Sequence, residues 1–323
     1  MASRNKKNNS DSATFGGQGF VWRKHSWSTE LLEIWHKGCV KSEWSPLTDV
    51  TLVLPDQKYL SLDRNNPDQY LFLEIPNVQK FVEQCYTLTE MYQRLGVHVH
   101  LIEQESSMFL PNYIFQRDTY CATPLGVILG RPAAEQRRKE EVLQQKNLAK
   151  LDVPIIMMPI QQSYFEGADL LWIDENNAII SINNRSNRYF IKQLQSIFEN
   201  VHIHQIELPQ GIQHTLGILN FLSKGTVAVW ESRLSQSVRD ILEEIPSITE
   251  IILMKEDEEI EVQRALNWVL IRDNCIVMPS GAPNTTAFLR SIGVEVHCVD
   301  VSEYIKCGGA MGCATGILGR SSI

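Results

Sequence analysis

Short apolar runs rich in β-branched residues recur along most of the chain, and they constrain its fold more than any other feature. The runs are residues 49–55, 98–103, 126–131, 153–160, 168–174, 177–183, 202–209, 226–230, 250–254, 275–279 and 294–301. Apolar runs of about four to eight residues bounded by turn signals are typical of buried strands. A membrane helix needs roughly 20 consecutive apolar residues, which none of these runs reaches. The chain is therefore expected to fold around many short strands.

Segments with apolar residues at helical spacing separate some of the strands. They are residues 75–96, 133–149, 188–198, 234–245 and 284–293. Other strands follow one another across turn-like sequences at 175–177, 223–225 and 273–274. This order is not a simple alternation of strand and helix. It indicates a mixed unit of strand, strand, helix and strand that is used about five times, although the sequence itself shows no repeat.

The composition is that of an acidic globular protein. Of the 323 residues, 43% are hydrophobic and 21% are charged, and the formal net charge is −8. No basic cluster is long enough for a nucleic-acid surface, and the charged run 139–150 is interpreted as the solvated face of a helix. A nucleic-acid or membrane partner is therefore not expected. The oligomeric state stays open, with a homodimer as one candidate.

The two ends of the chain differ in character. Residues 1–20 are polar and rich in glycine, serine and asparagine, and we expect them to form a disordered tail. Residues 21–323 are expected to form a single α/β domain. The segment 20–45 is rich in tryptophan, and the sequence assigns it no role.

Seven cysteines are scattered through the chain: Cys39, Cys85, Cys121, Cys275, Cys298, Cys307 and Cys313. Their number is odd and no secretory signal precedes them, so we expect free thiols in a reducing cytoplasm. The spacing of Cys307 and Cys313 is not a usual zinc spacing. His202 and His204 lie on alternate residues of a strand and are interpreted as surface side chains. No metal or other cofactor is expected.

The stretch "KCGGAMGCATG", residues 306–316, surrounds Cys313 with glycines. Glycine lets the backbone turn sharply and approach a ligand closely. A cysteine on such a turn can meet backbone N–H groups and become an exposed nucleophile with a lowered pKa. A buried cysteine in a glycine turn explains the same stretch equally well, so the stretch alone leaves both interpretations open.

Four further stretches place ionisable residues next to apolar runs. They are Arg117 and Asp118 in "YIFQRDTYC", Glu166 and Asp169 in "SYFEGADLLWID", Arg185 in "NNRSNR" and His214 in "GIQHTLGILNF". Each stretch alone is a weak signal, because a single ionisable residue in a loop more often has a structural role. Their order along the chain, ending in the Cys313 turn, is far more specific.

In this order the motifs resemble those of the guanidine-modifying superfamily, which comprises arginine deiminases, dimethylarginine dimethylaminohydrolases and amidinotransferases. The resemblance covers roughly residues 45–320, and its most specific parts are the cysteine turn and the two acidic motifs. It implies a pseudo-fivefold α/β propeller of ββαβ units, the pentein fold, around a central active-site channel. That architecture agrees with the repeated mixed unit inferred above.

The resemblance also implies roles for these residues within a catalytic domain that spans 21–323. Cys313 would attack the central guanidinium carbon, and His214 would act as general acid and then as general base. Asp118 would pair the substrate N–H groups, and Glu166 would hold either the guanidinium or the His214 ring. Arg185 would clamp a carboxylate at the other end of the substrate.

The remaining substrate-binding candidates are Arg117, Asp169, Leu216 and Gly309. For Arg117 and Asp169 a structural role is the stronger alternative, namely pairing with a neighbouring acid and capping of a turn. Gly309 is included because glycines near Cys313 let the backbone approach a ligand closely.

Leu216 marks a departure from the superfamily pattern. Arginine deiminases and amidinotransferases usually carry His-x-Asp, whereas this chain has His214-Thr215-Leu216. A leucine cannot pair with a guanidinium N–H, and each unpaired buried donor costs roughly 1–3 kcal/mol. An alkylated nitrogen fits better beside Leu216, and the dimethylarginine hydrolases likewise lack that acid. An unusual substrate would explain the leucine equally well. Glu74 is a candidate to replace the missing acid.

The leading hypothesis is a cysteine-dependent hydrolase of arginine or of an N-substituted, arginine-like guanidine. It would work through a covalent amidino-cysteine intermediate and release a ureido product with ammonia or an alkylamine. Two alternatives stay open. One is an amidinotransferase that moves the amidino group from arginine to an acceptor amine, and the other is a catalytically silent propeller that acts as a binding module.

Overall fold

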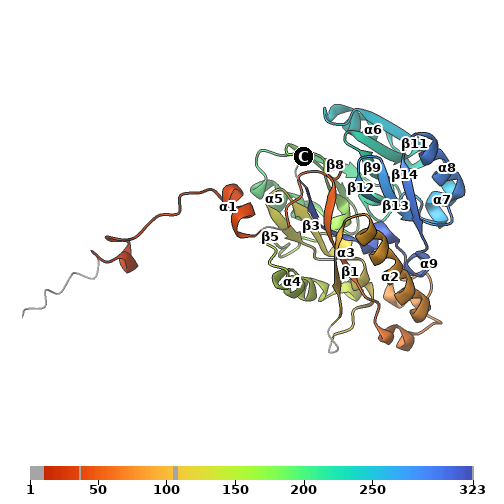
Figure 1. The fold of residues 1–323 in the computed structure, drawn as a ribbon, viewed down its shortest axis with the longest axis horizontal. Helices are drawn as coiled ribbons and strands as arrows, with labels where there is room; N and C mark the ends of the chain where they lie inside the picture. Colours follow the sequence, from red (N-terminus) through yellow and green to blue (C-terminus); the bar gives the residue numbers. More distant parts are fainter. Residues whose placement is uncertain (1–10, 36–37, 105–107, 322–323) are drawn as a thin grey trace, which may run out of the picture. The chain divides into compact units, whose positions relative to one another are not determined.

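The structure is a computed structural model that describes residues 11–35, 38–104 and 108–321 (Figure 1). The chain divides into two units, residues 1–36 and residues 37–323. The first unit contains the short helix η2 (Ala13–Phe15) and helix α1 (Trp27–Ile34). Residues 1–10 of the predicted tail lie outside the described residues. Residues 21–36, which the sequence analysis placed in the main domain, fall in the first unit.

In the described part of the larger unit, five three-stranded sheets share one plan. The middle strand pairs antiparallel with one neighbour and parallel with the other, and a helix connects the parallel pair. The sheets and their helices are β3 (Tyr120–Thr123), β4 (Gly126–Leu129), α4 (Glu140–Lys150) and β5 (Ile155–Met157); β6 (Leu170–Trp172), β7 (Asn177–Ile182), α5 (Arg188–Ile197) and β8 (His202–Glu207); β9 (Leu219–Ser223), β10 (Thr226–Trp230), α6 (Gln236–Glu244) and β11 (Glu250–Met254); β12 (Val269–Arg272), β13 (Cys275–Pro279), α8 (Pro283–Ser291) and β14 (Glu295–Val299); β15 (Gly316–Arg320), β1 (Leu47–Val53), α2 (Val78–Arg94) and β2 (His98–Ile102). The predicted pseudo-fivefold propeller of ββαβ units is confirmed.

Short helices join these units. They are η3 (Gln57–Ser61), η4 (Pro67–Tyr70), η5 (Pro111–Ile114), α3 (Gln116–Thr119), η6 (Glu135–Arg137), η7 (Gly167–Asp169), η8 (Thr215–Gly217), η9 (Glu231–Arg233), α7 (Asp257–Val262), α9 (Ser302–Lys306) and α10 (Met311–Ala314). Four of them, α3, η7, η8 and α10, carry or adjoin ionisable residues that the sequence analysis selected.

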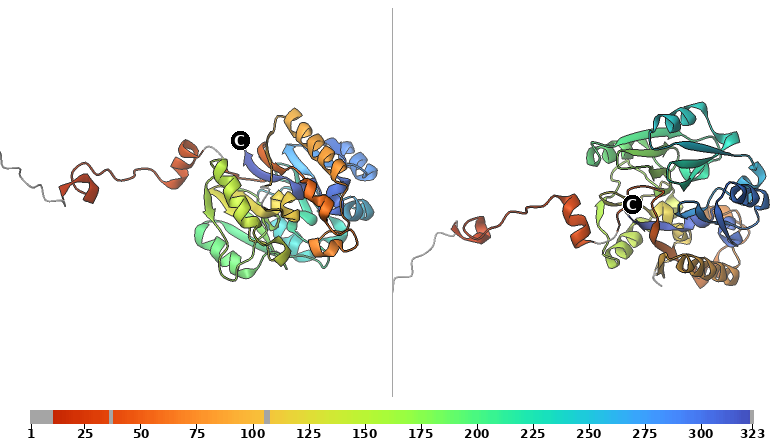
Figure 2. Two further views of the ribbon diagram at one scale, coloured as in Figure 1. Left: turned by 90° about the horizontal axis from the view of Figure 1, so that it is seen from below. Right: turned by 45° about the horizontal axis from the view of Figure 1, so that its top comes forward.

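The fifth sheet joins the two ends of the larger unit. Strand β15 pairs antiparallel with β1, so that Ile317 lies opposite Val50 and Gly316 opposite Thr51. Figure 2 shows the blue C-terminal strand beside the orange-red β1. A Cβ on Gly316 would lie only 2.5 Å from the Tyr120 hydroxyl, so this close approach requires glycine. The ring of sheets is therefore complete only when the last strand has docked.

The larger helices cover the outside of the sheets (Figure 2). Helix α5, for example, buries Phe190, Ile191 and Leu194, and the Phe190 ring stacks on Phe165 at a centroid distance of 4.0 Å. Full burial of one such side chain stabilises the fold by roughly 1.5–3 kcal/mol. The helices thus supply packing, while strand ends and short helices are left to form the centre.

Helix α4 is less solvated than the sequence suggested. Glu140, Leu143 and Gln144 are buried, so the interpretation of residues 139–150 as a solvated face is wrong for one side of the helix. The physical reason is Arg137, which lies just before the helix and pairs with Glu140 at 2.8 Å. That ion pair draws the polar start of α4 into the protein.

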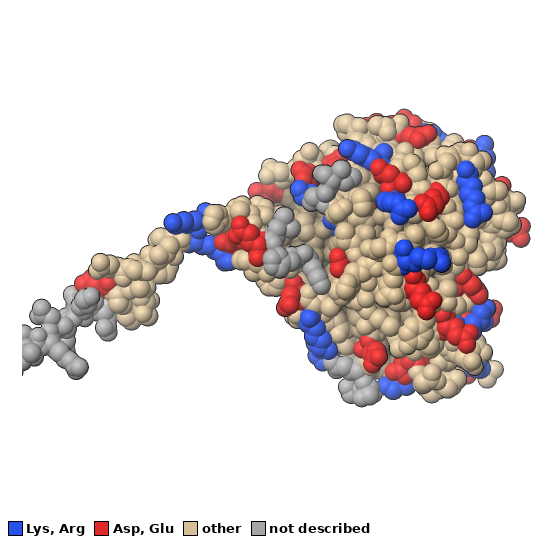
Figure 3. Space-filling model, in the orientation of Figure 1, with Lys and Arg blue, Asp and Glu red and all other residues tan. Residues whose placement is uncertain are grey.

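On the face drawn in Figure 3, acidic and basic side chains are interspersed and form no continuous basic patch. Within the described ranges, no helix is both long enough and apolar enough to cross a lipid bilayer.

Arg320 in β15 attaches the closing strand to its surroundings. Its buried guanidinium donates through Nη1 to the Ser45 carbonyl at 2.6 Å and to the Leu270 carbonyl at 3.1 Å. Burial lowers the pKa of Arg320 to about 10, although Glu43 opposes this shift. A shorter side chain at position 320 could not donate a hydrogen bond to either of these carbonyl oxygens.

We expect Arg320→Ala to lower the free energy of unfolding by about 2–4 kcal/mol, because two buried carbonyl oxygens lose their donor. The matched control is Arg272→Ala, which removes an exposed arginine paired with Glu295. That change should cost less than about 1 kcal/mol. Urea denaturation measures both variants, and equal losses would contradict the anchoring role of Arg320.

Candidate active site

Cys313 lies in the short helix α10, directly after a tight glycine turn. Gly308 has φ +94°, in the left-handed region that favours glycine. A Cβ on Gly309 would lie 2.5 Å from the Phe115 ring and 3.0 Å from the Cys313 Cβ. Gly309 therefore lets the turn pack against Phe115 and brings the half-buried thiol to the wall of a hollow.

Asn267 fixes the orientation of this turn. Its backbone carbonyl accepts from the Gly312 amide at 3.1 Å, and its side-chain Oδ1 accepts from the Cys313 amide at 3.1 Å. Its Nδ2 lies 3.3 Å from the Cys313 Sγ, which it reaches as a donor. One buried amide thus holds both the backbone and the sulfur of Cys313.

Three buried carboxylates gather around Arg137. Its Nη1 donates to Asp118 Oδ2 at 2.7 Å and to Glu166 Oε2 at 3.2 Å, and its Nη2 donates to Glu140 Oε2 at 2.8 Å. Asp118 Oδ1 has no hydrogen-bond partner, and it is the only fully buried carboxylate oxygen in that state among the described residues. This oxygen can accept an N–H from a ligand.

His214 is held by the same carboxylates. Its Nε2 lies 2.7 Å from Glu166 Oε2, and its Nδ1 lies 3.8 Å from Asp118 Oδ1. Burial lowers the pKa of His214, but Asp118, Asp169 and Glu166 outweigh burial and raise it to about 9. Burial likewise raises the pKa of Glu166, yet Arg137 and His214 lower it to about 2. At neutral pH the two groups therefore form an imidazolium–carboxylate pair.

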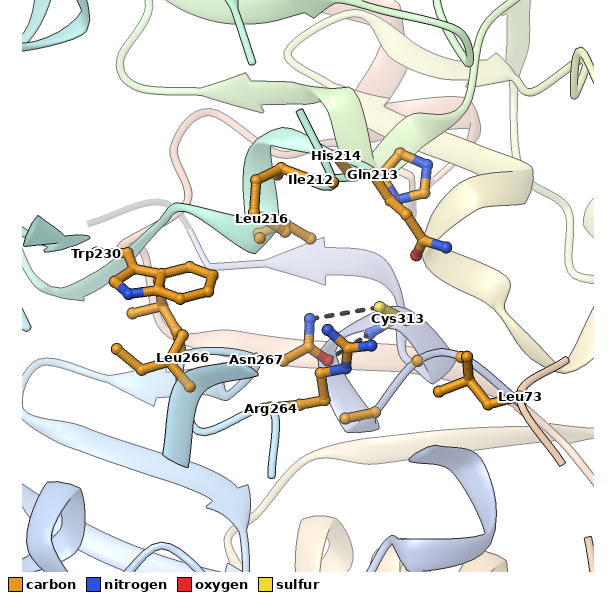
Figure 4. Close-up of a pocket in the computed structure, with 16 residues that line it drawn as sticks. Leu73, Ile212, Gln213, His214, Leu216, Trp230, Arg264, Leu266, Asn267 and Cys313 are labelled. Carbon is orange, nitrogen blue, oxygen red and sulfur yellow. Dashed lines mark hydrogen bonds between the residues drawn. The ribbon is translucent and has the colours of Figure 1, made fainter. Parts of the chain in front are cut away.

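Two hollows meet at Cys313. The inner hollow is narrow, about 20 Å³, and is lined by Asp118, Arg137 and Arg185. The outer pocket is about 290 Å³. Both are walled by Gln213, His214, Gly308, Gly309 and Cys313. Figure 4 shows His214 and Cys313 on the walls of the outer pocket, with Leu216 and Trp230 farther along it.

The Cys313 thiol is not activated in the free protein. Burial raises its pKa, and the negative charge of Asp118 raises it further, while the Ala310 backbone, Asn267 and Arg264 lower it less. The exposed thiol with a lowered pKa, one of the two interpretations that the sequence left open, is therefore not found in the free protein. A cation bound beside Asp118 would reverse the electrostatic part of this shift.

A metal ion fits this site poorly. Asp118, Glu166 and His214 offer ligand atoms within 4.8 Å of one another. The Arg137 guanidinium already binds both carboxylates, however, and His214 carries a proton at neutral pH. A divalent ion would have to displace one positive charge and deprotonate another.

A sequence profile described as "N,N dimethylarginine dimethylhydrolase, eukaryotic" matches residues 74–317, which is most of the chain. The chain belongs to this family. The dimethylarginine dimethylaminohydrolase family is part of the guanidine-modifying superfamily, so the resemblance drawn from the motifs is confirmed. The enzyme class inferred from the sequence, a hydrolase of amidine C–N bonds, is confirmed with it.

Individual relatives are distant. The uncharacterized protein YkgA of Bacillus subtilis is 22% identical over 284 residues, which cover 87% of this chain and 94% of that protein. The dimethylarginine dimethylaminohydrolase of Pseudomonas aeruginosa, in a complex with citrulline, has a TM-score of 0.68 at 20% identity and covers 85% of this chain and 100% of its own. SxtG, an amidinotransferase from Microseira wollei, has a TM-score of 0.72 at 16% identity and covers 88% of this chain and 98% of its own. At these identities the structural likeness shows the fold alone.

The structure of this family member brings most of the selected side chains together. Cys313, His214, Asp118 and Arg185 line the inner hollow, and Glu166 is buried behind His214. The Arg185 guanidinium lies 3.3 Å from Glu166 Oε1 and also borders an outer groove. The roles of these residues stay predictions.

Arg117 and Asp169 do not reach either hollow at Cys313. Arg117 donates through Nη2 to Glu43 at 2.7 Å, and both side chains are buried in this separate ion pair. Asp169 accepts hydrogen bonds from Ser181, Asn183 and Ser186. Their placement among the substrate-binding residues is therefore corrected, because all their partners are structural.

Asp169 supports the site indirectly. Its acceptors fix the turn at Asn183–Ser186, and its backbone carbonyl accepts from the Thr215 hydroxyl at 2.8 Å. One residue thus positions the turn that carries Arg185 and the loop that carries His214.

The structure also bears on two further predictions, the free state of the cysteines and the replacement of the missing acid by Glu74. All seven cysteines lie in the described residues and are free thiols, and Cys307 is buried beside the turn. Glu74 is exposed and lines neither hollow, so it does not replace the acid missing at Leu216. Leu216 is buried and lines the outer pocket.

Sequence reasoning missed Asn267, Arg137 and Arg264. Asn267 lies inside an apolar run, and Arg137 lies in a charged helical stretch, so neither stands out by composition. The spacing of Arg137 and Glu140 was the one available signal, because residues three apart on a helix can pair.

Asn267→Ala should slow alkylation of Cys313 by iodoacetamide at pH 8 by about tenfold, because the thiolate loses a hydrogen-bond donor. The pKa of the Cys313 thiol should also rise in this variant. Peptide mass spectrometry measures the rate across a pH series, with the exposed Cys298 as the reference thiol in the same sample. If the two rates keep their wild-type ratio, Asn267 does not act on the sulfur.

His214 should make stability depend on pH. Its pKa rises from 6.5 to about 9 on folding, so its stabilisation is complete below about pH 6.5 and is lost as the pH rises through about 9. In a Cys313→Ser background, which removes the thiol titration, the free energy of unfolding should fall by roughly 1–3 kcal/mol over that window. Urea denaturation at several pH values measures this slope. Adding His214→Gln should remove it, and a slope that persists would assign the titration to another group.

Proposed function

We propose that the chain is a cysteine-dependent hydrolase of an N-substituted, arginine-like guanidine, with Cys313 as nucleophile. The observation that carries the proposal is the free Oδ1 of Asp118. It is a buried carboxylate oxygen without a hydrogen-bond partner, 3.8 Å from His214 Nδ1, and Asp118 lines the same hollow as Cys313. A guanidinium is a permanent planar cation with N–H donors at its edge, so it supplies what this oxygen lacks.

The substrate's other end is proposed to lie near Arg185. This arginine lines the inner hollow and borders the outer groove formed by residues 182–185 and 208–213. Its side chain is 20% exposed, so it can turn to meet a ligand carboxylate. A guanidinium offers two parallel donors to a carboxylate, which is the reason to use arginine at such a position.

Binding of the substrate cation activates the nucleophile. The guanidinium pairs with Asp118 and adds a positive charge beside Sγ, so the Cys313 pKa falls and the thiol proton leaves to water. The thiolate then attacks the guanidinium carbon, and the C–N bond to the leaving amine breaks as His214 protonates that nitrogen. The product of this step is an amidino-cysteine thioether.

The second half releases the ureido product. His214, now neutral, takes a proton from water, and the resulting hydroxide attacks the amidino carbon. The C–S bond breaks, the Cys313 thiolate departs, and the protonated ureido product loses its proton. The Glu166 carboxylate holds the imidazole through both proton transfers.

Leu216 favours a substituted nitrogen. Its buried side chain lines the wall of the outer pocket and offers no acceptor to an N–H. The outer pocket also favours one second candidate, an amidinotransferase, because a cavity beside Cys313 could admit an amine in place of water. The binding-module hypothesis has less support, since it leaves the paired charges of His214 and Glu166 without a use.

The proposed compartment is a reducing cytoplasm. Seven free thiols support it, because thiols persist where glutathione and thioredoxin keep them reduced.

Mass spectrometry of products and of the Cys313 peptide tests the proposal. The panel is arginine, monomethylarginine, dimethylarginine, agmatine and guanidinoacetate, each with and without glycine. We expect a ureido product and an alkylamine from an N-substituted substrate. Cys313→Ser should abolish turnover and the adduct, Cys307→Ser should be nearly silent, and His214→Asn should slow turnover by about 10²–10⁴-fold.

Other outcomes decide between the hypotheses. Ornithine together with an amidinated amine would establish the transferase. Substantial turnover by Cys313→Ser would reject the nucleophile. If no compound of the panel gives either a product or an adduct, guanidine hydrolysis is rejected for this chain.

A further inference from the structure

The outer pocket is much larger than a methylated nitrogen requires. Its volume is about 290 Å³, whereas a group of the size of one water molecule takes about 30 Å³. Its apolar walls are Ile212, Leu216, Trp230, Ile260 and Leu266. Two methyl groups would leave most of this apolar surface wet, so the pocket is suited to a longer substituent.

Trp230 presents only carbon to this pocket. Its indole N–H donates to Asp257 at 2.6 Å and is therefore already satisfied. The side chain is buried, and Figure 4 shows its ring directed into the pocket, with Leu216 and Leu266 nearby. Such a wall favours contact with an alkyl or aryl chain and offers no hydrogen bond to a polar group.

Arg264 is the one charged side chain on the wall of the outer pocket besides the protonated His214. Figure 4 shows its guanidinium beside the Asn267 amide and directed toward Cys313. Its Nε is buried without a hydrogen-bond partner, and no carboxylate among the described residues forms an ion pair with it. By contrast, Arg137 and Arg185 both pair with Glu166.

We infer that the outer pocket is a subsite for a substituent on the guanidine nitrogen that is apolar along its length and ends in a carboxylate, which pairs with Arg264. This inference rests on the proposed function and names its substrate class. The amine released by hydrolysis is then an amino acid whose carboxylate is separated from its nitrogen by a short carbon chain.

Charge balance supports the carboxylate. A guanidinium bound at Asp118 would add a second cation near Cys313, which Arg264 already influences, and like charges in a partly buried site repel. A carboxylate on the substituent removes this repulsion and supplies a charge-assisted partner to a buried donor. Arg264 lines the same pocket as the apolar side chains, so a substituent that packs against them can also present an acid to Arg264.

Two matched substrates test the subsite: Nω-propylarginine and Nω-(3-carboxypropyl)arginine. The wild-type protein should favour the second by about tenfold or more in kcat/KM, since an arginine–carboxylate pair is a charge-assisted hydrogen bond. Arg264→Gln should bring the ratio to within about twofold. Gln keeps a long side chain at a residue whose φ is +56°, so it adds no new backbone strain.

Two further variants locate the effect. Arg239→Gln, on the outer helix α6, should leave the ratio unchanged. Arg185→Gln should lower turnover of both substrates together, because both carry the same arginine end. Equal use of the two substrates by the wild-type protein, or a preference that survives Arg264→Gln, overturns the inference.

The same experiment separates this inference from the proposed function. Hydrolysis of methylarginine with no turnover of either longer substrate rejects the subsite and leaves the function standing. If no guanidine is turned over, the proposed function fails, and calorimetric binding of the two compounds to Cys313→Ser decides the subsite. Binding about tenfold tighter for the carboxylated compound, lost in Arg264→Gln, supports it, and equal binding rejects it.

Discussion

One buried arginine holds the candidate site together. Arg137 pairs with Asp118, Glu140 and Glu166, which come from three separate segments of the chain. Breaking a buried ion pair by removing one partner costs roughly 3–5 kcal/mol, because a charge is left uncompensated. The four side chains therefore form one unit. The free oxygen of Asp118 and, through Glu166, the orientation of His214 both depend on it.

The charges of this unit explain the chemistry that the site can perform. Glu166 is committed to Arg137 and His214, so it stays ionised and keeps the imidazole protonated near neutral pH. Asp118 has one oxygen committed to Arg137 and one left over. The Asp118 oxygen that has no hydrogen-bond donor favours binding of a cation with N–H groups. The proton on His214 can be donated to the leaving nitrogen. Binding and proton transfer are thus assigned to different carboxylates.

Much of this could be predicted from the sequence, and the missing parts share a cause. The second and third strands of each unit are apolar runs that stand out, whereas β3, β9, β12 and β15 were not among the predicted runs. Each of these four pairs antiparallel with the middle strand of its sheet, and β15 does so with β1 from the other end of the unit. Cys313 and His214 lie in recognisable motifs. Asn267, Arg137 and Arg264 have roles that exist only through contacts with residues far along the chain, and composition carries no sign of such contacts.

The thiol and the outer pocket place opposing demands on a substrate. Arg264 lowers the pKa of Cys313, so its positive charge favours the thiolate. A carboxylate that neutralises Arg264 strengthens binding, but it also raises the Cys313 pKa again. The guanidinium at Asp118 lowers that pKa. An acid-bearing substituent should therefore improve binding more than it improves the chemical step. A neutral substituent would leave both cations facing Cys313, which favours the thiolate and weakens binding. The inner hollow and the outer pocket meet at Cys313. A guanidinium in the inner hollow therefore mainly raises the reactivity of the thiol, whereas an acid in the outer pocket mainly raises the affinity for the substrate.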